Sequence, residues 1–203
     1  MPTTAEITVA ILAGGAATRL GGRDKGLELL GGRPLIERVV AAVAQMDAPA
    51  HPANVVIVAN RHLAEYARCA PVLRDLVGGF RGPLAGVATA LAKCPTAWLL
   101  TVPVDCPDPP HDLARRFCHA LHEGGADALV ARDGERRQPL FALYRRELAG
   151  SAAQAVTSSQ GVHQWQESIG AREVDFHDRR QQFHNLNTFE DFAAYAESPR
   201  FPG

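Results

Sequence analysis

A glycine pair followed by clustered cations is the first feature of this sequence that could do chemistry. The apolar run before the pair predicts a buried strand that ends at Gly14 and Gly15. Because glycine has no Cβ, the backbone can turn sharply there and a ligand can approach the main chain. Successive N–H groups in such a loop form a concave site for anions. Arg19, Arg23 and Lys25 add three cations within seven residues, so the stretch indicates a polyphosphate site.

Spacing excludes two better-known phosphate loops. The P-loop requires G-x-x-x-x-G-K-[ST], but five positions after Gly14 or Gly15 stand Arg19 and Leu20. The dinucleotide-binding fingerprint requires G-x-G-x-x-G and an acidic residue after the second strand. Here the glycines are adjacent, and the second predicted strand ends in Val58-Ala59-Asn60. The remaining alternative is a flexible glycine turn with solvated basic residues.

The choice of lysine at position 25 supports the phosphate interpretation. Of the 21 basic residues only Lys25 and Lys93 are lysine, so arginine serves wherever a generic positive charge suffices. The compact ammonium group of lysine suits close contact with a phosphate oxygen. Lys93 falls late in a helical pattern, where a surface charge explains it.

Composition sets the broad class of the protein. The chain has 203 residues, 46% hydrophobic and 21% charged, which is enough for one full core. No apolar run approaches the roughly 18 residues of a membrane span, and no basic region precedes the first apolar run, so we expect no signal peptide. The four scattered cysteines contain no C-x-x-C pair, which argues against a zinc site and fits a reducing cytoplasm. A net charge of −1 predicts no nucleic-acid or membrane partner.

Strands alternate with helices in the first half, which predicts an α/β fold with a parallel sheet. After the first strand we expect a helix from Pro34, strands over 55–58, 72–73 and 98–102, and helices over 62–69 and 83–91. Ligands of such sheets bind outside the carboxyl ends of the strands. Gly14, Asp75 and Asp105 each follow a predicted strand, so we expect all three at one edge. Asp75 and Asp105 could alternatively serve as turn-capping residues.

The second half has a different pattern. Residues 128–131 and 140–144 predict a β-hairpin with Asp133-Gly134 at or near its turn. Helices are expected over 146–156 and 163–169, with a short strand near 173–176. Thr188 is the expected N-cap of a last helix, with Asp191 three residues on, and the tail over 197–203 is expected to fray.

Several motifs stand in a characteristic order over residues 7–192. They are Leu12-Ala-Gly-Gly15 with Arg19 and Lys25, Arg74-Asp75, Gly82-Pro-Leu-Ala-Gly86, Val102-Pro-Val-Asp105-Cys-Pro107, Asp133-Gly-Glu-Arg136 and Asn185-Leu-Asn187-Thr188. The opening loop resembles that of the nucleotidyltransferase superfamily with a Rossmann-like fold. The later motifs narrow the resemblance to the molybdenum cofactor guanylyltransferase family.

The resemblance implies a fold and a division of labour. The fold would be a single α/β domain of Rossmann-like type, with a mostly parallel central sheet flanked by helices and a β-hairpin insertion in the second half. Residues 7–108 would bind the nucleotide, and residues 109–196 would bind the acceptor.

The resemblance also implies roles for individual residues. The nucleotide would meet a main-chain and side-chain set from the first half: Leu12, Ala13, Gly14, Gly15, Lys25, Asp75 and Asp105. Arg19, Lys25 and Asp105 would be catalytic, with Lys25 on phosphate and Asp105 on Mg²⁺. The family often has Asn-Ala-Asn-Arg after the second strand, whereas this chain has Val58 in place of the first Asn, which removes one side-chain contact with the nucleotide.

For the acceptor, the resemblance implies Arg136, Asn185 and Asn187. The alternatives are that the arginines around the hairpin form a solvated face and that the two asparagines order the chain before the last helix.

The reaction implied is transfer of GMP from GTP to the terminal phosphate of molybdopterin, with release of pyrophosphate. Since the attacking phosphate is already an anion, the reaction needs Mg²⁺, cations and main-chain donors more than proton transfer. A cytidylyltransferase that acts on the same cofactor or on a sugar-like phosphate remains an alternative. Such relatives tend to open with Leu-Ala-Ala-Gly, whereas Gly14 gives this chain Leu-Ala-Gly-Gly. A GTP-binding module without catalysis is a second alternative. The resemblance further implies a cytoplasmic monomer or weak oligomer that binds small molecules and makes transient contacts with cofactor synthesis and insertion proteins.

Overall fold

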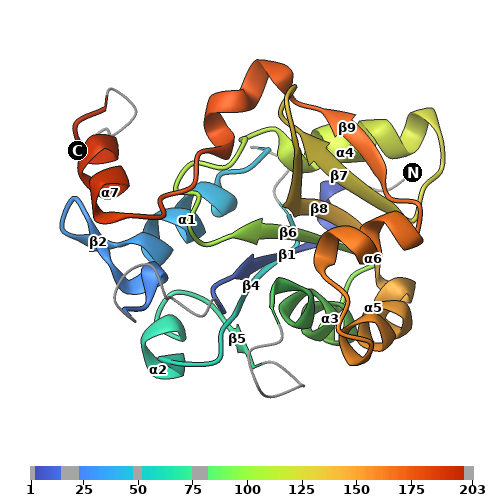
Figure 1. The fold of residues 1–203 in the computed structure, drawn as a ribbon, viewed down its shortest axis with the longest axis horizontal. Coiled ribbons are helices and arrows are strands. Elements are labelled where there is room, and N and C mark those ends of the chain that lie inside the picture. Colours follow the sequence, from blue (N-terminus) through green and yellow to red (C-terminus); the bar gives the residue numbers. More distant parts are fainter. Residues whose placement is uncertain (1–2, 15–22, 48–51, 75–81, 199–203) are drawn as a thin grey trace.

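A seven-stranded sheet runs through both halves of the chain in the order β5-β4-β1-β6-β8-β7-β9 (Figure 1). The structure is a computed structural model, and it describes residues 3–14, 23–47, 52–74 and 82–198. The strands are β1 (Ile7–Leu12), β4 (Asn54–Val58), β5 (Val72–Leu73), β6 (Trp98–Pro103), β7 (Ala128–Arg132), β8 (Arg137–Arg145) and β9 (Arg172–Asp175). A separate two-stranded ribbon pairs β2 (Leu29–Leu30) with β3 (Arg33–Pro34).

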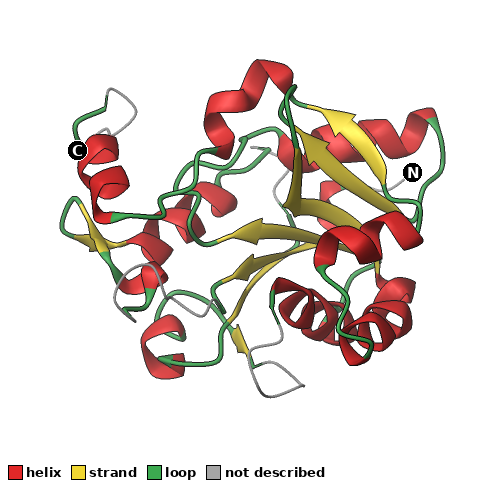
Figure 2. Ribbon diagram, viewed as in Figure 1, coloured by secondary structure: helices red, strands yellow, loops and turns green. Residues whose placement is uncertain are grey.

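Helices cover both faces of this sheet (Figure 2). The α-helices are α1 (Leu35–Ala44), α2 (Leu63–Tyr66), α3 (Pro83–Lys93), α4 (Leu113–Glu123), α5 (Ala149–Thr157), α6 (Val162–Ser168) and α7 (Phe189–Ala196). Short 3-10 turns are η1 (Thr4–Glu6), η3 (Lys25–Leu27), η4 (Arg146–Leu148) and η5 (His177–Phe183). One core packs α1, α4 and α7 against the sheet, and the other packs α3, α5 and α6.

The continuous apolar sequence of β1 follows from this double cover. Ile7, Val9 and Ile11 face the core that contains α1, while Ala10 and Leu12 face the core that contains α3. A strand buried on both faces has no polar side to alternate with, which is why it appears in sequence as an unbroken hydrophobic run.

The direction of β8 decides where the second half places its loops. Strand β8 pairs antiparallel with both β6 and β7, and every other neighbouring pair in the large sheet is parallel. Two antiparallel pairings in succession make β7 run in the same direction as β6. The turn after β7 therefore lies at the same sheet edge as the ends of β1 and β6. In Figure 1 the arrows of β1, β4 and β6 point toward the side where α2, β2 and α7 lie.

The expected α/β architecture is confirmed, and so is the hairpin, whose two strands belong to the central sheet. The expectation that Pro34 opens a helix was wrong by one residue, because Pro34 closes the β2–β3 ribbon and precedes α1 as its N-cap. The ribbon itself was not predicted. It depends on Gly31 and Gly32, which both have positive φ, at 60° and 80°.

Helix α4 was also not predicted. Its buried residues, Leu113, Ala114, Phe117, Ala120 and Leu121, follow a helical spacing, but charged and polar residues separate them. Both tryptophans, Trp98 and Trp165, are buried, and all four cysteines are free thiols. No helix in the described part of the chain is long and apolar enough to cross a membrane.

Candidate active site

Three side chains from distant parts of the chain meet at the carboxyl edge of the sheet. The ammonium group of Lys25 donates hydrogen bonds to Asp105 Oδ2 and to Asn187 Oδ1, both at 2.9 Å. Lys25 begins η3, Asp105 follows β6, and Asn187 precedes α7. The side chains of Lys25 and Asp105 are 22% and 20% exposed, so the cluster is reachable from solvent and yet largely shielded by protein.

The loop that carries Asp105 is fastened on two sides. The N–H of Val104 donates to the carbonyl of Leu12 at 3.1 Å, which ties the loop to the end of β1. The N–H of Leu186 donates to the carbonyl of Asp105 at 2.8 Å, which ties it to the segment before α7. The other carboxylate oxygen, Asp105 Oδ1, is buried and has no hydrogen-bond partner among the described residues.

Asn187 is held through its main chain while its side chain reaches Lys25. Asp191 Oδ2 accepts hydrogen bonds from the N–H groups of Asn187 at 2.7 Å and Thr188 at 2.9 Å. Thr188 Oγ1 accepts from the N–H of Asp191 at 3.2 Å, so the expected capping box is confirmed. The backbone hydrogen bond from Asn187 lowers the pKa of Asp191 despite its partial burial. The Asn187 backbone orders the chain before α7 through Asp191, and its amide oxygen accepts a hydrogen bond from Lys25.

Gly14 follows the end of β1 and lies beside Asn60 and the carbonyl of Val58. The N–H of Ala13 already donates to the carbonyl of Val58 at 2.9 Å, so a nucleotide has to use other main-chain groups. A Cβ built on Gly14 would lie 3.5 Å from Asn60 Nδ2, an ordinary contact, and Gly14 is not among the glycines with positive φ. Neither conformation nor packing within the described protein requires glycine at position 14.

Asn60 therefore lies beside Gly14, although the sequence interpretation left it out of the site. The signal available in the sequence was its position two residues beyond the end of β4, at the carboxyl edge of the sheet. Val58, which replaces the Asn of the family, is the last residue of β4 and is 1% exposed. It packs in the core formed with α3.

The hairpin turn holds Arg136 out toward solvent at the same edge. Asp133, which is 4% exposed, accepts hydrogen bonds from the N–H groups of Glu135 and Arg136 and from Gln138 Nε2. Burial alone would raise the pKa of Asp133, but these donors together lower it. The Arg136 side chain is 76% exposed, and its guanidinium lies 3.7 Å from Asp133. Within the described ranges Arg136 has no hydrogen bond or ion pair with Lys25, Asp105 or Asn187.

Asn185 is nearer the cluster than Arg136. Its carbonyl accepts a hydrogen bond from Asn187 Nδ2 at 3.4 Å, and its own amide oxygen is buried without a hydrogen-bond partner among the described residues. The remaining predicted site residues, Gly15, Arg19 and Asp75, lie outside the described residues.

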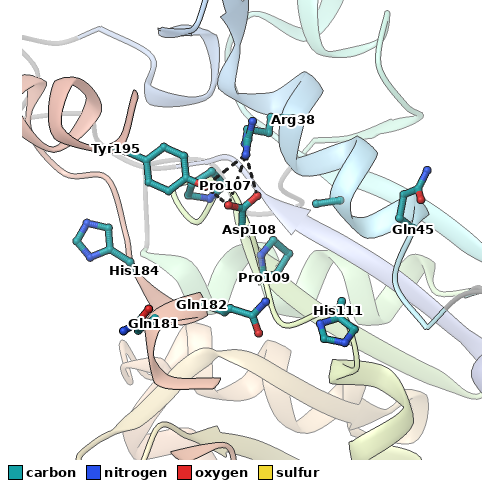
Figure 3. A pocket seen from close by; sticks show the side chains of 11 residues that line it. Arg38, Gln45, Pro107, Asp108, Pro109, His111, Gln181, Gln182, His184 and Tyr195 are labelled. Carbon is teal, nitrogen blue, oxygen red and sulfur yellow. Dashed lines mark hydrogen bonds and ion pairs between the residues drawn. The ribbon is translucent and has the colours of Figure 1, made fainter. Parts of the chain in front are cut away.

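A pocket of about 400 Å³ lies behind the Asp105 loop, along α1 (Figure 3). Arg38 Nη2 donates to Asp108 Oδ1 at 3.2 Å, and the Tyr195 hydroxyl also donates to Asp108. His111, Gln182 and other polar residues complete the lining. None of the described residues predicted to form the site lines this pocket. The Arg38–Asp108–Tyr195 contacts join α1, the loop after Asp105 and α7. They therefore fix α7, which follows Asn187 in the chain, against the loop that carries Asp105.

No cluster of three or more His, Cys, Asp or Glu side chains that could hold a metal occurs in the part of the chain that the structure describes. The cluster of Lys25, Asp105 and Asn187 contains a single carboxylate, that of Asp105. This donor set fits Mg²⁺, which is usually held by one or two carboxylates together with substrate phosphates. The unpartnered Oδ1 of Asp105 is the atom on which that fit rests.

Known proteins resemble this chain in sequence and in structure. Residues 9–174 match the family described as MobA-like NTP transferase domain. A molybdenum cofactor guanylyltransferase from Vibrio cholerae is 39% identical over 91% of this chain and 89% of its own length. Another, from Photobacterium profundum, is 34% identical over 98% of this chain and 100% of its own.

Two solved structures show that the fold is shared. Molybdopterin-guanine dinucleotide biosynthesis protein A from Archaeoglobus fulgidus has a TM-score of 0.74 at 23% identity, covering 94% of this chain and 97% of its own. A 4-diphosphocytidyl-2C-methyl-D-erythritolsynthase from Anaerococcus prevotii has a TM-score of 0.71 at 14% identity, covering 96% and 97%. With the family matched over residues 9–174 and relatives of such identity along nearly the whole length, the chain belongs to the MobA-like NTP transferase family.

Proposed function

We propose that this chain transfers the GMP unit of GTP to the terminal phosphate of molybdopterin, releasing pyrophosphate and forming the guanine dinucleotide form of the molybdenum cofactor. The observation that carries the proposal is the 34–39% identity, along more than nine-tenths of the chain, to proteins named molybdenum cofactor guanylyltransferase. The Lys25–Asp105–Asn187 cluster at the carboxyl edge supplies groups suited to such a reaction.

The reaction is an in-line displacement at phosphorus. An oxygen of the molybdopterin phosphate forms a bond to the α-phosphorus of GTP, and the bond from that phosphorus to the oxygen bridging to the β-phosphate breaks. The pair of electrons leaves with pyrophosphate. Because the nucleophile is already ionised at neutral pH, no proton has to be removed. The protein must bring two anions together and stabilise the charge that develops on the leaving group.

Lys25 and Gly14 are the described residues best placed to meet the triphosphate. The Lys25 ammonium is a compact point charge that can move from Asp105 and Asn187 to a phosphate oxygen. Gly14 has no Cβ, so a ligand can approach its main chain closely, and the nearest described protein atom would lie at an ordinary contact distance from a Cβ there. Gly15, Arg19 and Asp75 complete the nucleotide side in this proposal.

Asp105 would hold Mg²⁺. The Asn187 side chain lies near Asp105, since both accept hydrogen bonds from Lys25. When bound, the ion neutralises phosphate charge and favours departure of pyrophosphate. Asp105 is suited to this by its unpartnered oxygen and by a loop fixed to both β1 and the segment before α7. Asn187 is suited to orienting Lys25 because its own backbone is fixed by Asp191.

The acceptor side rests on the second half of the chain. Residues 7–108 bind the nucleotide in this proposal, and residues 109–196 bind molybdopterin. Support comes from β8, whose direction brings the hairpin turn with Arg136 to the edge where Lys25 and Asp105 lie. The enzyme then works in the cytoplasm, as a monomer or weak oligomer, in transient contact with proteins that make and insert the cofactor.

The test is incubation of the protein with each of the four NTPs, Mg²⁺ and molybdopterin, with and without molybdate, while pyrophosphate and dinucleotide product are measured. We expect product with GTP at a kcat/KM far above that with CTP or ATP. A higher kcat/KM with CTP would overturn the guanylyl assignment. GTP binding without any pyrophosphate release would instead identify a binding module.

A further inference from the structure

The loop that carries Lys25 is held from a distant part of the chain. The phenol of Tyr66, in α2, donates a hydrogen bond to Asp24 Oδ1 at 2.5 Å. The same carboxylate oxygen accepts from the N–H of Gly26 at 3.2 Å. The side chain of Asp24, the residue before Lys25, therefore binds both Tyr66 and the N–H of Gly26, the residue after Lys25.

Close packing strengthens this arrangement. Tyr66 is fully buried, and a Cβ on Gly26 would lie 2.4 Å from the Tyr66 hydroxyl oxygen and 3.0 Å from Val104 Cγ2. Only glycine fits between the two side chains without displacement of one of them. Since Val104 precedes Asp105, Gly26 adds a packing contact between the two loops that the Lys25–Asp105 ion pair already joins.

We propose that Tyr66 is a positioning residue for Lys25, acting through Asp24 to aim the lysine ammonium at the phosphate-binding centre. The inference rests on the proposed role of Lys25 in phosphate binding. Among the described residues Tyr66 forms no hydrogen bond with Asp105 or Asn187, and its hydroxyl binds Asp24, so its effect on the reaction would pass through the lysine loop.

The chemistry of the pair suits a fixed donor. Burial and the neighbouring Asp24 raise the pKa of Tyr66 above its usual range, so the phenol keeps its proton and donates throughout the physiological pH range. A hydrogen bond from a neutral group to a carboxylate is among the stronger kinds in proteins. Without the phenol hydroxyl, Gly26 would be the remaining donor to Asp24 Oδ1 among the described residues, through the longer bond.

The test is a double-mutant cycle on GTP affinity, with wild type, Tyr66→Phe, Lys25→Met and the double variant. Affinity is measured without Mg²⁺ or acceptor, so that the cycle stands whether or not guanylyl transfer occurs. We expect Tyr66→Phe to weaken GTP binding about tenfold in the wild-type background. In the Lys25→Met background it should produce no further loss. An equal loss in both backgrounds would overturn the proposal, because Tyr66 would then act independently of Lys25.

Two further sets of variants keep the proposal open to refutation if Tyr66→Phe is poorly folded. Asp24→Ala should reproduce the tenfold loss, and Asp24→Asn, which keeps an acceptor oxygen for both donors, should restore most of the affinity. If Asp24→Ala and Asp24→Asn bind GTP with the same affinity, the proposal is contradicted.

The matched control is Tyr144→Phe, which removes another fully buried hydroxyl, bonded to Gln166 Nε2. Tyr144→Phe should lower the melting temperature and leave GTP affinity unchanged. If it weakens GTP binding as much as Tyr66→Phe does, the loss of affinity in Tyr66→Phe reflects general destabilisation and the proposal is overturned.

Wild-type pyrophosphate release separates the two proposals. Failure of guanylyl transfer by the wild-type protein would refute the proposed function and leave the binding cycle intact. Additive losses in the cycle would refute the positioning role of Tyr66 and leave the proposed function standing.

Discussion

Lys25 and Asp105 form an ion pair, with 2.9 Å between Nζ and Oδ2. The group proposed to bind phosphate and the group proposed to hold Mg²⁺ are thus in direct contact with each other. Each stabilises the other's charge in a partly shielded position. Lys25 uses Asp105 Oδ2, so Asp105 Oδ1 stays available for the metal ion while the ion pair is intact.

The ion pair predicts opposite effects of Asp105→Asn on binding and on turnover. Without Mg²⁺, we expect the variant to bind GTP at least as tightly as wild type, because a carboxylate no longer competes for Lys25 or repels the triphosphate. With Mg²⁺ and acceptor, pyrophosphate release should fall at least ~100-fold, by analogy with loss of one preorganised electrostatic group. Isothermal titration and a coupled pyrophosphate assay measure the two effects. Near-normal turnover, or a collapse of the melting temperature, would favour a structural role for Asp105.

Asn187 and Arg136 should differ in how they affect the reaction. Asn187→Ala removes an acceptor from Lys25, so we expect a lower kcat as well as a higher KM for molybdopterin. Arg136→Glu should raise only the KM for molybdopterin, about fivefold, as befits one exposed charge, and leave GTP affinity unchanged.

A matched control for Arg136→Glu is Arg145→Glu. Arg145 is exposed and pairs in the sheet with Trp98, the first residue of β6, which places it at the opposite edge. The same change of charge there should alter neither KM. Equal effects of both reversals on the KM for molybdopterin would show that net charge, and not a site at the hairpin turn, explains the result.

Two glycines of the same region should respond differently to alanine. At Gly14 the added methyl makes only ordinary protein contacts, so we expect an unchanged melting temperature and GTP binding weakened on the order of tenfold. At Gly26 the methyl would overlap Tyr66, so we expect destabilisation of about 1–3 kcal/mol from overpacking. Thermal melts and GTP titrations of both variants test this contrast, which would be refuted by a Gly14→Ala protein with normal GTP affinity.

Asp47 should make stability depend on pH. Burial raises the pKa of this carboxyl to about 6, above its ordinary value of 3.8, so the folded protein binds the proton more tightly than the unfolded chain. The contribution to stability is therefore complete below pH 3.8 and is lost as pH rises through about 6. The shift corresponds to about 3 kcal/mol.

The variant that tests this is Asp47→Asn, which keeps an oxygen to accept from the Arg115 N–H and tolerates the positive φ of 56° at this position. We expect it to be more stable than wild type at pH 8 and equal to it near pH 4, as measured by denaturant unfolding at both values. A constant difference between the two proteins across this range would mean that Asp47 does not titrate as proposed.

The sequence alone determined the elements whose signals are local. The unbroken apolar runs of β1 and β6, the capping box at Thr188 and Asp191, and the turn at Asp133 and Gly134 all depend on neighbours within a few residues. For the same reason the sequence predicted that Gly14 and Asp105 each follow a strand, and that the ends of these strands lie at one edge of the sheet. Family motifs extended this to Lys25 and Asn187, without indicating that the two would touch.

Tertiary structure decided the contacts between residues far apart in the chain. Lys25 meets Asn187 across 162 positions and Asp105 across 80, and Tyr66 holds Asp24 across 42. Nothing in the local sequence of Tyr66 distinguishes it from an ordinary core tyrosine. Its hydroxyl acquires a role only because the packing of α2 against the lysine loop places the carboxylate of Asp24 within hydrogen-bonding distance. Local pattern can predict that such a side chain is buried, but the partner it finds there depends on how the whole sheet and its covering helices pack.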